Sequence, residues 1–147
     1  MFRNLQTYHL PGFKMSAEAL GAALASQSFT PCAPSDLLSE GWDAPRADGL
    51  VHVVNGHFLL KLTSERKVLP AAVINQAAKA RAAEIEEAQG FAPGKKAMKE
   101  LRERVADELL PRAFAKRGSM WVWIDPRNGW LVVDTASPAN TRLMRQY

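Results

Sequence analysis

The chain has 147 residues, of which 47% are hydrophobic and 23% charged, and its formal net charge is +4. These values are ordinary for a folded chain in water, so they exclude disordered and fibrous classes, and the length fits one domain or two small lobes. The single cysteine, Cys32, excludes an internal disulfide and favours a reducing compartment. The N-terminal segment lacks the apolar core of a signal peptide, and no apolar run approaches the roughly 20 residues of a membrane helix. We therefore expect a cytoplasmic protein without membrane attachment.

The N-terminal third predicts a strand, a short helix and a long loop. Residues 2–10 (FRNLQTYHL) mix aromatic and apolar side chains without helical spacing, and a Pro-Gly pair follows them, which indicates a strand. Ser16 can cap a helix over residues 16–26, where leucines recur at four-residue spacing. Residues 31–49 are rich in Pro, Gly, Asp and Ser, so we expect a surface loop there.

Two hairpins are predicted further along the chain. Asn55 and Gly56 tolerate the positive φ angles of a tight turn, and β-forming residues flank them within residues 50–62 (LVHVVNGHFLLKL). A second pair of strands is predicted within residues 120–135 (MWVWIDPRNGWLVVDT), with its turn at residues 126–129.

Two helices are predicted between the hairpins, over residues 70–89 and 95–110. Each has an apolar stripe at helical spacing, and Pro111 ends the second helix because proline lacks an amide hydrogen. The stripes consist of Ile74, Ala78, Ala82 and Ile85 in the first helix, and of Met98, Leu101, Val105 and Leu109 in the second.

The order of these elements, β-α-ββ-α-α-ββ, predicts an α+β fold. We expect a single unit over residues 1–147, in which a mostly antiparallel sheet is built from β-hairpins and the helices pack on one face.

Motifs of the common enzyme classes are absent from the sequence, which has no GxxxxGK[ST], GxGxxG, HExxH or paired CxxC. A zinc site built on its three histidines would need a further nitrogen or sulfur ligand, which only Cys32 could supply, so we do not expect one. Cys32 could act as a nucleophile with His52 or His57 as base, but a lone cysteine is more often a small core residue. We therefore predict no enzymatic activity, no catalytic residue, no metal and no cofactor.

Positive charge is concentrated in the middle of the chain. Residues 61–117 carry thirteen basic and eight acidic side chains, whereas residues 1–60 carry three and five. At about 100° per residue, Lys95, Lys99 and Arg102 form a stripe beside the apolar seam of their helix, away from its acidic residues. Such a stripe favours a phosphate-binding surface, although lysines also flank a seam to cover it with their stems.

Further cations follow the helix and end the first hairpin, so three segments could build one surface facing a polyanion. The predicted nucleic-acid contacts are Lys95, Lys99, Arg102, Arg112, Lys116 and Arg117, with Lys61, Arg66 and Lys67 as outer contacts.

Aromatic residues near the second hairpin predict an interface. In MWVWID, Trp121 and Trp123 point to the face opposite Met120, Val122 and Ile124. Exposed tryptophans could stack on unpaired bases, but no basic residue alternates with them in the strand, so burial or an oligomer interface is favoured. The predicted interface residues are Phe114, Trp121, Trp123 and Trp130, and Phe114 belongs to the core if it is buried and to an interface if it is exposed.

Eight stretches, in order along nearly the whole chain, resemble the bacterial recombination-associated RdgC family. They are FRNLQTYHL, SFTPC, GW at 41–42, VVNGHFLL, KVLPAAVINQA, LLPRAFAK, MWVWID and NGWLVVD. The resemblance implies a cytoplasmic, nucleoid-associated protein that is not an enzyme and binds mainly double-stranded DNA without marked sequence preference. It also implies a ring-shaped homodimer with a basic inner surface, which restrains the RecA recombinase by competing for DNA.

Chains of this family run well beyond the VVD strand, whereas this sequence stops after TASPANTRLMRQY. We therefore expect it to correspond to the N-terminal portion of a longer family chain. If one contact surface of the ring lies in the missing half, DNA binding is weaker but need not vanish. The alternative is an interaction or dimerisation fragment with no useful DNA affinity of its own.

Overall fold

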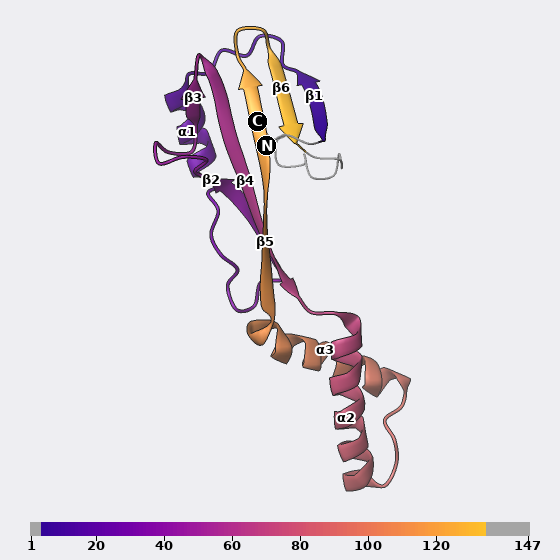
Figure 1. Ribbon diagram of the computed structural model, residues 1–147. Coiled ribbons are helices and arrows are strands. Elements are labelled where there is room, and N and C mark those ends of the chain that lie inside the picture. The colour runs from indigo at the N-terminus through magenta and orange to yellow at the C-terminus, as the bar shows by residue number, and fades with distance from the viewer. Residues whose placement is uncertain (1–3, 135–147) are drawn as a thin grey trace. The chain divides into compact units, whose positions relative to one another are not determined.

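The computed structural model describes residues 4–134, which form six strands, three α-helices and one 3-10 helix (Figure 1). Their bounds are β1 Leu5–His9, α1 Ala17–Ala25, β2 Leu38–Asp43, β3 His52–Val54, β4 His57–Val68, α2 Ala71–Gln89, α3 Lys95–Leu109, η1 Leu110–Arg112, β5 Phe114–Asp125 and β6 Trp130–Asp134.

The six strands form one antiparallel sheet with the order β1-β6-β5-β4-β2, and β3 pairs with β4 (Figure 1). Trp130 of β6 lies opposite His9 of β1 on one side and opposite Asp125 of β5 on the other. At the β3–β4 turn, Asn55 and Gly56 have φ angles of 51° and 80°, as the sequence predicts for this hairpin. The α+β class is confirmed, and the order of the elements roughly matches the prediction.

The chain divides into two compact units. The first, here called the sheet unit, consists of residues 4–30, 40–64 and 117–134 among those described. The second, the helical unit, consists of residues 31–39 and 65–116. Strands β4 and β5 contribute residues to both units.

The core of the sheet unit lies between α1 and one face of the sheet. Ser16 caps α1 as predicted, because its Oγ accepts a hydrogen bond from the Ala19 amide at 3.1 Å. Leu20 and Leu24 of α1 are buried in one cluster with strand residues such as Val122. Burial of these apolar side chains is what holds the helix on the sheet.

The other two helices have a separate core. Their predicted stripes meet around Ala78, Leu101 and Val105, which are buried in a cluster of their own. The prediction that all the helices pack on the sheet therefore holds for α1, whereas α2 and α3 cover each other. Within residues 4–134, no helix is both long and apolar enough to cross a membrane.

Three strands differ from the sequence-based prediction, since β4 runs to Val68, beyond the end of the predicted hairpin at residue 62. The expected loop over residues 31–49 contains β2, and β5 begins at Phe114, ahead of residue 120, where the second hairpin was predicted to begin. All three differences involve β4 or its neighbours in the sheet. Pairing with a distant strand therefore outweighs the local preference of polar and glycine-containing segments for turns.

Candidate nucleic-acid interface

Helix α3 presents cations along one exposed side. Burial of Leu101 and Val105 fixes which side of the helix faces the core of the helical unit. Lys95, Lys99 and Arg102 lie beside that seam within a sector about 60° wide, and all three are exposed. None of them forms an ion pair with another described residue. Their charges can therefore meet an anionic partner without first breaking an internal pair.

A second basic group surrounds Glu108, more than about 100° around α3 from this stripe. The guanidinium of Arg81, from α2, hydrogen-bonds and pairs with Glu108 and lowers the pKa of that carboxyl. The charges of Arg104 and Arg112 lower the pKa of Glu108 further. Arg112 is thus an electrostatic neighbour of Glu108.

The sequence-based prediction did not include Arg81 and Arg104, the two other cations whose charges act on Glu108. The four-residue spacing of Arg104 and Glu108 is the local signal for a pair on one side of α3. Arg81 comes from another helix, and no local pattern indicates its contact with Glu108.

Arg66 and Lys116 are also exposed in the helical unit, on β4 and β5 respectively. Six predicted contacts are therefore exposed in this unit, namely Arg66, Lys95, Lys99, Arg102, Arg112 and Lys116.

The prediction of Lys67 as an outer nucleic-acid contact needs correction. Lys67 is only 8% exposed, and its ammonium points into the helical unit. Its Nζ donates hydrogen bonds to the carbonyl oxygens of Leu110 at 3.0 Å and Pro34 at 3.3 Å. A side chain held in this way does not reach a phosphate on the surface. We therefore remove Lys67 from the predicted contacts.

Lys61 and Arg117 lie in the sheet unit, and both have partners there. The Lys61 ammonium is 3.9 Å from Asp43 Oδ2 and 5.6 Å from the ring centre of Trp121. The Arg117 guanidinium stacks over Phe29 at 5.0 Å. These contacts make both side chains part of the local packing of the sheet.

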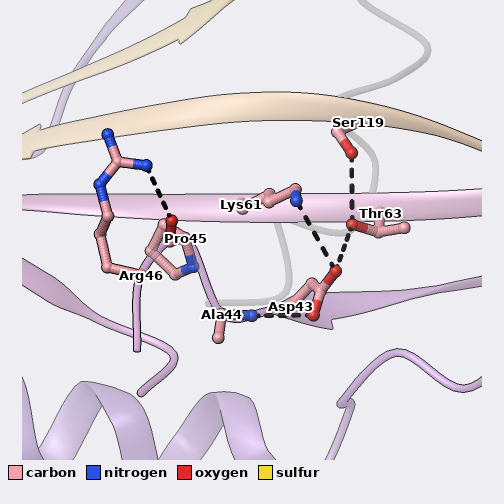
Figure 2. A network of polar contacts seen from close by, with 7 residues as sticks. All are labelled: Asp43, Ala44, Pro45, Arg46, Lys61, Thr63 and Ser119. Carbon is pink, nitrogen blue, oxygen red and sulfur yellow. Dashed lines mark hydrogen bonds and ion pairs between the residues drawn. The ribbon is translucent and has the colours of Figure 1, made fainter. Parts of the chain in front are cut away.

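Figure 2 shows the polar network around Lys61, which joins three neighbouring strands. Thr63 donates its hydroxyl hydrogen to Asp43 Oδ2 at 2.9 Å. Since that hydrogen is used, Thr63 Oγ1 is left to accept from the hydroxyl of Ser119 at 3.4 Å. Thr63 is only 1% exposed, so this network satisfies a buried hydroxyl.

The aromatic residues lie as alternation along a strand predicts. Met120 and its alternate neighbours on β5 are buried in the sheet core, whereas Trp121 and Trp123 are partly buried on the other face. The Trp123 indole N–H donates to His57 Nδ1 at 3.1 Å. Trp130 is 45% exposed and Phe114 is 88% exposed, so Phe114 is not a core residue of this chain as described.

The residues considered for catalysis or metal binding have local roles. The Cys32 thiol donates to the carbonyl oxygen of Glu65 at 3.2 Å, and the Cys32 amide donates to the carboxylate of the same residue at 3.1 Å. His52 is 2.9 Å from the carboxylate of Asp48, and their hydrogen bond lowers the pKa of that acid. Among residues 4–134, no group of three or more His, Cys, Asp and Glu side chains is arranged to hold a metal ion.

Comparison with known proteins gives matches over nearly the full length. A family model described as "Putative exonuclease, RdgC" matches residues 1–145. The chain belongs to the RdgC family.

Curated RdgC relatives are similar to this chain across almost all of it. The "Recombination-associated protein RdgC" of Janthinobacterium sp. (strain Marseille) is 55% identical over 140 residues, which cover 94% of this chain and 47% of the relative. The protein of the same name from Herminiimonas arsenicoxydans is 56% identical with the same coverage. That of Cupriavidus necator is 49% identical over 98% of this chain and 49% of the relative. The chain thus spans about half the length of these RdgC relatives, whose names associate them with recombination.

Proposed function

We propose that this chain is a non-enzymatic, recombination-associated protein that binds DNA, mainly duplex, through its phosphates and without sequence preference. The observation that carries the proposal is the exposed stripe of Lys95, Lys99 and Arg102 on α3, free of internal ion pairs with described residues. Membership of the RdgC family supports the association with recombination.

The physical basis is the release of counterions from the phosphate backbone. Each lysine or arginine that neutralises a phosphate displaces condensed cations, so binding weakens steeply as salt is added. Lysine stems are flexible. The stripe therefore lacks side chains held in a fixed geometry, which hydrogen bonding to particular base edges would require. Such a surface binds duplexes of different sequence with similar affinity.

The test is a titration of labelled duplex at several salt concentrations with the variant in which Lys95, Lys99 and Arg102 are all alanine. Loss of three phosphate contacts predicts a slope of log affinity against log salt that is shallower by about 2.7. The matched control is Lys96→Ala, because Lys96 lies on α3 beyond the stripe, toward its acidic side. Equal effects of the two variants on the slope would refute the stripe as the contact surface.

The matching family model is described as a putative exonuclease. We propose binding without cleavage, and the same duplex incubated with the chain and Mg²⁺ is expected to keep its length on a denaturing gel. Shortened strands would refute this part of the proposal.

Three further properties are proposed for the protein in its cell. It lies in the cytoplasm on the nucleoid, acts as a homodimer and restrains RecA by competing for DNA. Competition predicts that inhibition of RecA strand exchange by this chain is relieved by excess unrelated duplex.

The second candidate function is dimerisation or protein interaction without useful DNA affinity. The 88% exposure of Phe114 favours it, because aromatic side chains are enriched at protein interfaces and among their energetically dominant residues. Sedimentation with and without duplex separates the two candidates, since a dimer that ignores duplex at low salt supports this one.

A further inference from the structure

Lys67 joins three segments of the helical unit. It lies near the end of β4, its side chain reaches the carbonyl oxygens of Leu110 and Pro34, and its amide donates to the Leu37 carbonyl at 2.8 Å. The end of α3 and the loop over residues 31–39 are thus both fastened to β4 through one residue.

The chemistry of this contact suits a buried ammonium. A lysine ammonium has three donors and no acceptor, so burial requires acceptors around it. The last carbonyl groups of a helix lack intrahelical partners and lie at the negative end of its dipole. Leu110 directly follows α3, so its carbonyl offers both an acceptor and a favourable field to Lys67.

The anchored carbonyl lies where the chain leaves α3 toward two exposed cations. Arg112 is two residues beyond Leu110, and Lys116 follows on the first residues of β5. We propose that Lys67 is a positioning residue, which fixes the end of α3 and thereby places Arg112 and Lys116 for phosphate contact without touching DNA itself. This inference rests on the proposed DNA binding.

Arg66 provides the contrast on the same strand. Neighbouring residues of a strand point to opposite sides, and here Arg66 is exposed while Lys67 is 8% exposed. A direct contact and an internal anchor would therefore occupy adjacent positions, and the two roles predict different responses to salt.

The test compares Lys67→Met with Arg66→Met in duplex titrations over a series of salt concentrations. Loss of a phosphate contact at Arg66 is expected to make the slope of log affinity against log salt shallower by about 0.9. Loss of the anchor at Lys67 leaves the slope unchanged and weakens binding about tenfold at every salt concentration, because one or two released residues must be ordered again on binding. A shallower slope for Lys67→Met would make Lys67 a direct contact, and unchanged affinity would leave it a purely structural residue; either result overturns the proposal.

If Lys67→Met does not fold, reductive methylation of the wild-type chain still separates an internal anchor from a direct DNA contact at Lys67. The anchor predicts that Lys67 reacts much more slowly than Lys95 and that duplex protects Lys95 but leaves the rate at Lys67 unchanged. Rapid methylation of Lys67, or protection of Lys67 by duplex, would contradict the proposal. Absence of duplex binding by the wild-type chain would instead refute the proposed function, while slow methylation would still establish the anchor.

Discussion

At Gly41, the backbone of β2 passes against residues 28–29. A Cβ atom added there would lie 2.5 Å from both the Cα and the amide nitrogen of Phe29, closer than real atoms approach. The carbonyl and amide of Trp42 are hydrogen-bonded on the same side, to the Phe29 amide at 2.8 Å and the Gln27 carbonyl at 2.8 Å. The backbone at residues 27–29 therefore cannot move aside without breaking these bonds.

Gly41→Ala is expected to lower the free energy of unfolding by about 1–3 kcal/mol, the usual range for inserting a group into a packed site. Urea denaturation followed by tryptophan fluorescence measures it. The matched control is Gly118→Ala on β5, where the added Cβ would meet only Ser64 Oγ at 4.0 Å. Equal losses for the two variants would contradict the close approach at Gly41.

Phe114 is 88% exposed, so its side chain contributes little to the packing of the described chain. Phe114→Ser is therefore expected to leave the thermal midpoint nearly unchanged. If the chain dimerises through this residue, loss of a central aromatic anchor weakens the dimer by about 2 kcal/mol or more. Sedimentation equilibrium measures the dimer, and an unchanged dimer would remove Phe114 from the interface.

At the level of elements, the helices were predictable from the sequence, whereas β2 and the extensions of β4 and β5 were not. The bounds of α2 and α3 follow from local signals, namely the apolar stripes, the glycine-proline break between them and Pro111. β2 carries no such signal, because LSEGWD is polar and contains glycine, and its strand state depends on pairing with β4.

In the candidate site, too, features set by local periodicity were predictable, whereas features set by contacts distant in sequence were not. Periodicity alone predicted the exposed stripe on α3, because burial of the seam decides the rest of the helix surface. It could not separate Arg66 from Lys67, since the predicted strand ended at residue 62 and the alternation was not extended to them. The burial of Lys67 depends on the end of α3, which is distant in sequence.

The ion pair between Arg81 and Glu108 links α2 to α3 and predicts a pH effect. Because the pKa of Glu108 is lowered in the folded chain, its stabilising contribution is complete above its ordinary value of 4.5 and is lost as pH falls through the lower folded value. Arg81→Ala is expected to raise the pKa of Glu108 toward its ordinary value of 4.5. NMR titration of the side-chain carboxyl carbon measures this shift.

The matched variant for this prediction is Arg102→Ala, which removes a cation from the other side of the same helix. It is expected to leave the titration of Glu108 nearly unchanged. A comparable shift in both variants would mean that the overall charge of α3, and no specific pair, sets the pKa.

In the whole molecule, the six exposed cations of the predicted contact surface and the apolar sheet core belong to different units. The sheet unit buries α1 against its strands, whereas the helical unit carries the six exposed cations named above. The chain covers about half the length of its RdgC relatives. The proposed DNA binding rests on the exposed cations of the helical unit.

The central claim is that the helical unit binds duplex phosphates without recognising a base sequence. The most direct measurement is the affinity of the wild-type chain for two duplexes of equal length and unrelated sequence, over a series of salt concentrations. Binding through phosphates alone predicts equal affinities and a slope of log affinity against log salt between about −3 and −5, as expected if most of the six cations contact phosphates. A slope shallower than about −1, a strong preference for one sequence, or no binding at low salt would contradict it.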